Sequence, residues 1–144
     1  MTRFENIEIG ETMETAGRTI TEADLVNFAG VSGDFNHLHT DSERMSESSF
    51  DERIAHGALV FSISTGLLWQ ARKRPSHVVA FYGVDRLRFV APVFVGDTIG
   101  VTTEVIEKEP RDHPVASGVI RYGVTVSNQD EEAVLSCELL SLVE

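Results

Sequence analysis

The chain has 144 residues, of which 42% are hydrophobic and 24% are charged. This composition is typical of a globular protein and excludes a disordered or collagen-like chain. The length suits one domain, which we expect to span residues 1–144. The 12 basic and 23 acidic side chains give a net charge of −11. That charge argues against nucleic acid as a partner, because duplex affinity depends on basic groups, and against an anionic membrane surface.

Two features predict a cytoplasmic location. The single cysteine, Cys137, cannot form an internal disulfide, so nothing calls for an oxidising compartment. The opening residues MTRFENIEIGET lack the apolar segment of a secretory signal. Polar residues interrupt the most apolar stretch, residues 58–71, which is therefore too short to span a membrane. Cys137 lies in an apolar strand pattern and is interpreted as a core residue, not a nucleophile.

The first half of the chain predicts one short strand and several helical segments. A strand is expected near residues 13–20. The spacing of Thr21 and Asp24 is a helix start signal, and the apolar residues after it predict a helix of about two turns that ends near Gly30 and Gly33. Residues 33–41 are rich in turn formers and predict an ordered loop. A second short helix is expected near residues 42–48.

Residues 57–73 predict the longest helix. Apolar side chains lie on nearly every face of this segment, which indicates a helix surrounded by protein. The basic residues Arg72 and Lys73 suit the negative end of its dipole, and Pro75 is expected to stop it. Such a helix needs other elements to cover it.

The second half of the chain predicts that cover. Four β-rich runs are bounded by turn residues and span residues 78–90, 98–107, 115–127 and 133–143. Within them, Ile99, Val101, Thr103 and Val105 alternate with mostly polar neighbours, as expected for half-buried antiparallel strands. One curled antiparallel sheet around one long helix satisfies both burial patterns, so the predicted class is α+β.

A dense group of polar residues lies between the two predicted helices. It holds several possible proton carriers: Asp34, Asn36, His37, His39, Asp41 and His56. Histidine changes its charge nearest to neutral pH, so Asp34 and His39 form a plausible acid–base pair. Two alternatives remain open: Asp34 caps a turn while the histidines only pack, or His37, His39 and Asp41 bind a metal, although that spacing is loose for a metal site.

Two segments carry a resemblance to a known family. SGDFNHLHTD followed by FDERIAHGAL resembles the hydratase-2 signature of the MaoC-like dehydratases, which include the (R)-specific enoyl-CoA hydratases. The downstream segment RFVAPVFVGDTI, residues 88–99, also looks like the strand and turn of that family. The resemblance therefore spans most of the chain.

The resemblance implies a hot-dog fold, in which a curled antiparallel sheet wraps around a long central helix, and a homodimer or higher homo-oligomer. It implies reversible hydration of a trans-2-enoyl thioester to the (R)-3-hydroxyacyl thioester, with acyl-CoA or an acyl carrier protein thioester as substrate. No metal and no cofactor is expected. Two alternatives are a hot-dog thioesterase and a noncatalytic acyl-thioester binding subunit, such as one half of a heterodimer.

The resemblance also assigns the site residues. The catalytic residues fall on Asp34, His39, Asn36 and Gly57, with the backbone N–H of Gly57 as donor to the thioester oxygen. Residues expected to contact the substrate are Thr65, His56 and Phe35. For His56, which directly precedes the long helix, a structural role in capping or packing the turn is the favoured alternative. The sequence departs from the family at His37, where proline is usual, so a rigid φ angle is lost from the loop.

The coenzyme A phosphates leave no clear signal, because the chain has no glycine-rich phosphate loop. The candidate cations are Arg72, Lys73, Arg74, Arg86, Arg88 and Arg111. Phe28, Phe61, Trp69 and Phe81 could line an acyl tunnel, although apolar residues at such spacing are more often plain core.

Overall fold

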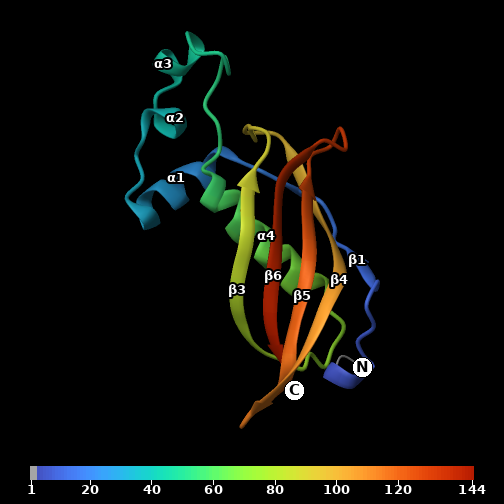
Figure 1. Cartoon of the computed structure of the whole chain (residues 1–144). Helices are drawn as coiled ribbons and strands as arrows, with labels where there is room; N and C mark the ends of the chain where they lie inside the picture. The colour runs from blue at the N-terminus through green and yellow to red at the C-terminus, as the bar shows by residue number, and fades with distance from the viewer. Residues whose placement is uncertain (1–2) are drawn as a thin grey trace.

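The structure is a computed structural model that describes residues 3–144. The described chain begins with a single 3₁₀ turn, η1 (Phe4–Asn6). Two short strands and four helices follow, and four long strands complete the chain (Figure 1). The first group comprises β1 (Thr12–Glu14), β2 (Arg18–Thr19), α1 (Glu22–Ser32), α2 (His37–Thr40), α3 (Ser42–Ser46) and α4 (Gly57–Ala71). The second comprises β3 (Val78–Phe89), β4 (Thr98–His113), β5 (Ala116–Ser127) and β6 (Ala133–Val143).

The strands form one antiparallel sheet in the order β1-β4-β5-β6-β3, with β2 paired to the end of β4. Consecutive strands β4, β5 and β6 are neighbours, whereas β3 pairs only with β6 and forms one edge. The N-terminal segment is fixed to the other end of the chain, because the N–H of Phe4 donates to the carbonyl of Glu144 at 2.9 Å. The two ends of the described chain therefore lie side by side.

One face of the sheet covers α4. Along β4, Ile99, Val101, Thr103 and Val105 are buried while the residues between them are mostly more exposed, so a single face points to the core. The helix contributes Leu59, Val60, Leu67 and Leu68 to the same apolar cluster. Burying each such side chain is worth roughly 1.5–3 kcal/mol. The predicted arrangement, a sheet wrapped around a central helix, is confirmed.

Cys137 is part of this core, as predicted. It is buried on β6, and burial raises the pKa of its thiol to about 11. A thiol held protonated at neutral pH is a poor nucleophile.

Five sequence predictions need correction. The strand expected at residues 98–107 continues to His113 as β4. The first helix has 11 residues, about three turns. It continues through Gly30, which is exposed, and ends only at Gly33, whose φ is +76°. The strand expected at residues 13–20 is two short strands, β1 and β2. The predicted loop contains the single turn α2. The long helix stops at Ala71, since Arg72 is already extended at ψ 138°, so Arg72 and Lys73 follow the helix and do not lie in its last turn.

Helices α1, α2 and α3 gather at one end of the molecule, beside the N-terminal end of α4 (Figure 1). The segment between α3 and α4 returns to the body of the protein at Ala55, whose N–H donates to the carbonyl of Val93 at 2.7 Å. This end holds the polar group singled out in the sequence. None of the helices between residues 3 and 144 has the length and apolarity needed to cross a bilayer.

Candidate active site

The end of α1 sets the position of Asp34. Gly33 takes the left-handed conformation that closes the helix, and its N–H donates to the carbonyl of Ala29. The hydroxyl of Ser32 donates to the carbonyl of Phe28 at 2.7 Å and accepts from the N–H of Asp34 at 3.1 Å. Asp34 Oδ1 in turn accepts from the N–H of Asn36 at 3.1 Å. Asp34 therefore does cap the turn, and its other oxygen, Oδ2, is the one nearer to His39.

Asn36 begins α2 and so fixes the direction of His39. Its side-chain oxygen accepts from the N–H of Leu38 at 3.0 Å, which is an N-cap bond. The hydroxyl of Thr40 donates to the carbonyls of Phe35 and Asn36 and closes the same turn. This single helical turn places His39 on the side that faces the core.

His39 is buried and its two ring nitrogens have different surroundings. Nδ1 lies 2.7 Å from the carbonyl oxygen of Ile54, so Nδ1 carries the proton of the neutral ring. Nε2 then keeps its lone pair and lies 3.9 Å from Asp34 Oδ2. Burial is the main cause that lowers the pKa of His39, with smaller contributions in the same direction from His56 and His37. A neutral histidine with a free Nε2 can accept a proton.

The gap between His39 and Asp34 is wider than a hydrogen bond. At 3.9 Å the two atoms do not bond directly, but a water oxygen about 2.8 Å from each would contact both. The Asp34 side chain is 50% exposed, so this gap is reachable from outside. The predicted acid–base pair is thus brought together, with its carboxylate at the surface and its imidazole inside.

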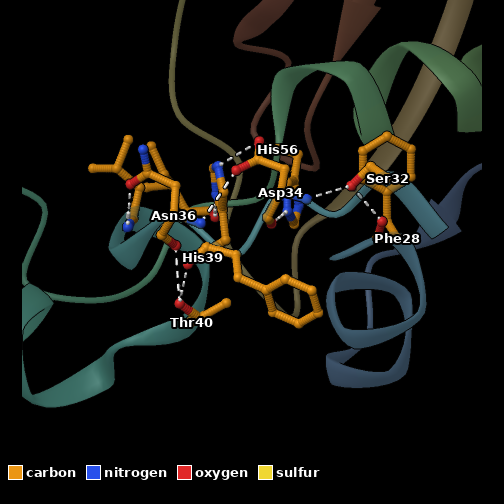
Figure 2. A network of polar contacts seen from close by, with 10 residues as sticks. Phe28, Ser32, Asp34, Asn36, His39, Thr40 and His56 are labelled. Atoms are coloured by element: carbon orange, nitrogen blue, oxygen red, sulfur yellow. Dashed lines mark hydrogen bonds and ion pairs between the residues drawn. The ribbon is translucent and has the colours of Figure 1, made fainter. Parts of the chain in front are cut away.

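His56 lies directly behind His39 and is only 2% exposed. The two imidazole rings stack with centroids 3.7 Å apart, and the ring of Phe28 contacts His56 edge-on at 5.0 Å. His56 Nε2 lies 3.0 Å from the carbonyl oxygen of Asp34. Figure 2 shows Phe28, Asp34, His39 and His56 gathered in this way. With so little exposed surface, His56 has almost nothing to offer a substrate in this conformation.

Gly57 is the first residue of α4, directly after His56. Its N–H is one of the helix-start donors that lack an intrahelical acceptor, and no acceptor for it occurs among residues 3–144. A Cβ at this position would lie 2.8 Å from three atoms of the Phe89 ring. Glycine therefore avoids a close contact with this ring, and the same small residue leaves room around its amide.

A salt bridge ties the segment before α4 to α1. The two terminal nitrogens of Arg53 donate to the carboxylate of Glu22 at 2.9 and 2.5 Å. One of them also donates to the carbonyl of His39 at 3.3 Å. The pair lowers the pKa of Glu22. Ile54 adds a backbone bond from its N–H to the carbonyl of Leu38 at 3.0 Å. Together these contacts hold α2 against the chain that leads into α4.

Arg53 and the carbonyl of Ile54 were not among the predicted site residues. The basic side chain of Arg53 was visible in the sequence, but only the fold brings it to Glu22, 31 positions away. Backbone carbonyls carry no sequence signal at all, because every residue has one.

Of the remaining predicted residues, Phe35 adjoins Asp34 in the chain, whereas Thr65 and Asp41 lie on other segments. Phe35 is 64% exposed beside Asp34. Thr65 lies eight residues along α4 from Gly57, about 12 Å by helix geometry, and its hydroxyl donates to the carbonyl of Ser62. Asp41 caps α3 by accepting from the N–H of Arg44 at 2.9 Å, so His37, His39 and Asp41 do not form a metal-binding group.

Asp34, His39 and His56 do bring ligand-type atoms within 4.8 Å of one another. The geometry nevertheless disfavours a metal. The two imidazole rings are stacked, with centroids 3.7 Å apart and planes only 26° apart, so their lone pairs lie in two separate, nearly parallel planes, which is unfavourable for binding one shared ion. In addition, His39 Nδ1 and His56 Nε2 both face backbone carbonyls. The cluster fits proton transfer better than metal coordination.

The candidate cations are dispersed. Arg86 and Arg111 bind carboxylates, those of Glu138 and Glu109. The Arg74 guanidinium lies 4.5 Å above the half-exposed Trp69 ring. Arg72 and Lys73 line a cavity of about 420 Å³ at the C-terminal end of α4, at the opposite end of this helix from His56. No phosphate site is defined by these positions.

Of the expected tunnel residues, Phe28 and Phe61 are partly buried against the core. Phe61 faces the half-exposed Phe81 with ring centroids 6.4 Å apart.

Fold and site together define a class of protein: a hot-dog domain with an aspartate–histidine pair at the N-terminal end of its central helix. A family model described as MaoC like domain matches residues 3–128. The chain belongs to this MaoC-like family.

Known proteins agree with that assignment. A solved structure described as a monoamine oxidase regulatory protein from Archaeoglobus superimposes with a TM-score of 0.91 at 42% identity, covering 98% of this chain and 93% of that one. The (R)-specific enoyl-CoA hydratase of Aeromonas caviae is 34% identical over 78% of this chain and 81% of its own length. Protein MaoC of Klebsiella aerogenes is 48% identical over 68% of this chain, but the match spans only 29% of that longer protein.

Proposed function

We propose that the protein catalyses reversible hydration of trans-2-enoyl-CoA to (R)-3-hydroxyacyl-CoA, as a homodimer. The observation that carries this proposal is the buried His39, whose Nδ1 is held by the Ile54 carbonyl so that its free Nε2 faces Asp34 at 3.9 Å. Next to this pair, Gly57 begins α4 with an unpaired N–H. The relative from Aeromonas caviae is named (R)-specific enoyl-CoA hydratase, which supports the same reaction.

Hydration requires a base for the water, a proton donor to C2 and a hydrogen-bond donor to the thioester oxygen, and the chain offers a group for each. His39 Nε2 takes a proton from water as the water oxygen bonds to C3 of the enoyl chain. The proton that His39 takes passes across the gap to the Asp34 carboxylate, and Asp34 delivers it to C2. Both groups then return to their starting state. The lowered pKa of His39 suits a base that must be neutral at the start.

Gly57 supplies the third of these groups. Negative charge develops on the thioester oxygen as water adds, and the N–H at the start of a 15-residue helix is a donor with the positive end of the helix dipole behind it. One such donor is typically worth about 3 kcal/mol of barrier. The reverse reaction, dehydration of the 3-hydroxyacyl thioester, uses the same groups.

The edge strand β3 supports the homodimer. Its second edge has no partner strand among residues 3–144, and it carries exposed apolar side chains that include Val79, Phe81 and Phe89. An exposed apolar edge strand is normally covered. A second copy that pairs along β3 would extend the sheet and cover these residues.

The test is a hydration assay with crotonyl-CoA, followed by the loss of enoyl absorbance, with chiral analysis of the product. Asp34→Asn and His39→Ala should each lower kcat by about 10²- to 10⁴-fold while the circular dichroism spectrum stays unchanged. Asp41→Asn and His37→Ala are matched controls from the same segment and should retain activity. Normal rates in both Asp34 and His39 variants would refute the assignment.

An assay with a thiol-reactive dye distinguishes the proposed hydratase from the main alternative, a thioesterase. A thioesterase would release free coenzyme A from saturated acyl-CoA, whereas the proposed hydratase leaves the thioester intact. Binding of enoyl-CoA without any loss of absorbance would instead indicate a noncatalytic subunit.

A further inference from the structure

His56 is an unusual residue at the start of a helix. It occupies the N-cap position of α4, where its carbonyl accepts from the N–H of Val60 at 3.1 Å, but its side chain makes no capping bond. Serine, threonine, aspartate or asparagine would stabilise the helix better at this position. The imidazole of His56 therefore serves something other than the helix itself.

Its contacts show what the ring holds. A carbonyl oxygen can only accept, so His56 Nε2, 3.0 Å from the carbonyl of Asp34, must carry the proton. Nδ1 is then an acceptor, and among residues 3–144 it is a buried side-chain atom without any hydrogen-bond partner. A buried polar atom left unpaired destabilises the folded protein. The chain tolerates this cost at a ring that touches the proposed catalytic residues.

The flat face of the same ring limits His39. With centroids 3.7 Å apart, the His56 ring blocks tilting of the His39 ring on one side, and the Ile54 carbonyl fixes rotation through Nδ1. On its far side His56 is backed by Phe28 of α1. His56 is thus packed between the two helices that flank the proposed active site (Figure 2).

We propose that His56 is a positioning residue: its Nε2–H holds the Asp34 backbone, and its ring holds the His39 imidazole, in register with the N–H of Gly57. The inference rests on the proposed hydration reaction and replaces the expected contact of His56 with substrate. His56 contacts Asp34 and His39 and precedes Gly57 in the chain. A single residue thus sets the positions of all three proposed catalytic groups relative to one another.

The kinetic test compares two amides at position 56. Glutamine places its NH₂ near the position of Nε2 and can still donate to the Asp34 carbonyl, whereas asparagine reaches only the position of Nδ1. His56→Asn should lower kcat for crotonyl-CoA about 100-fold, the cost of a displacement near 1 Å, with KM changed less than about threefold. His56→Gln should recover at least about tenfold of that loss. Equal kcat values for the two variants, whether high or low, would overturn the proposal.

The spectroscopic test uses the unmodified protein and does not depend on the reaction. Two-bond ¹H–¹⁵N spectra identify which ring nitrogen carries the proton. The expected result is a proton on Nε2 of His56 and on Nδ1 of His39. A proton on Nδ1 of His56 would overturn the proposal even if no variant folded. If the wild-type protein did not hydrate crotonyl-CoA, the hydration reaction would fail, but the spectra would still decide whether His56 donates to Asp34.

Discussion

At the scale of single residues, the protonation state of His39 controls both the proposed chemistry and part of the stability. Burial lowers the pKa of His39 in the folded protein below its ordinary value of 6.5. Asp34 and the Ile54 carbonyl act in the opposite direction but do not outweigh burial. Between the two pKa values the unfolded chain binds more protons than the folded one, so the free energy of unfolding should decrease as pH falls below about 6.5.

This pH dependence can be measured with His39→Asn, which retains a donor for the Ile54 carbonyl but cannot titrate. Urea unfolding of both proteins between pH 7.5 and 5 should show that the wild type loses more stability than the variant as the solution is acidified. The carboxylates titrate in both proteins and cancel in the difference. Parallel curves would show that the buried imidazole of His39 does not titrate in this range.

The sequence signals were strongest for residues whose proposed roles depend on their side chains. Asp34 and His39 are five positions apart, and a turn-rich segment with that spacing brings them together, as predicted. The role of His56 was not evident, because its partners are a backbone carbonyl and a ring face. Such contacts have no preferred residue spacing and depend on the angle between α2 and α4.

At the scale of elements, the contact between the start of α4 and the end of β3 decides how far Gly57 is open. Gly57→Ala keeps the N–H but adds a Cβ within 2.8 Å of the Phe89 ring. Because Phe89 is 55% exposed, its ring can move, and the loss of stability should be small. The same methyl group would crowd a thioester at the amide, so we expect kcat/KM to fall about 10- to 100-fold.

A double variant separates packing from substrate approach. In Phe89→Ala the added Cβ at position 57 meets no ring. If glycine is needed only because of Phe89, the Gly57→Ala/Phe89→Ala protein should match Phe89→Ala in kcat/KM. The proposed function instead predicts that it remains slower. Melting temperatures of all three proteins provide the control for folding.

The boundaries of the elements were less predictable than their order. The strand periodicity placed β5 and β6 to within one residue, because alternate burial on a sheet is written directly in the residue pattern. It gave the start of β4 correctly but not its end, since β4 continues six residues beyond residue 107. The end of α4 was placed two residues too late, since charge near a helix end does not fix its last turn. The break between β1 and β2 depends on pairing with β4, which local sequence does not encode.

At the scale of the whole molecule, the free edge of β3 predicts self-association. Light scattering should give twice the mass of one chain, and Phe81→Asp should reduce it to one, because a carboxylate would be buried at the joined edge. Phe81 is 52% exposed in the single chain. Val115→Asp, at the similarly exposed turn between β4 and β5, is the matched control and should remain a dimer. A monomeric wild type would contradict the proposed homodimer.

The hydrogen bond between Phe4 and Glu144 has a consequence for the connectivity of the fold. Since these two residues touch, a short linker could close the described chain into a ring. A new opening at the exposed turn around residues 129–131 would then start the polypeptide with β6, without removing any strand pairing. The neighbour relations of the strands in space, and not their succession along the polypeptide, are what define this architecture.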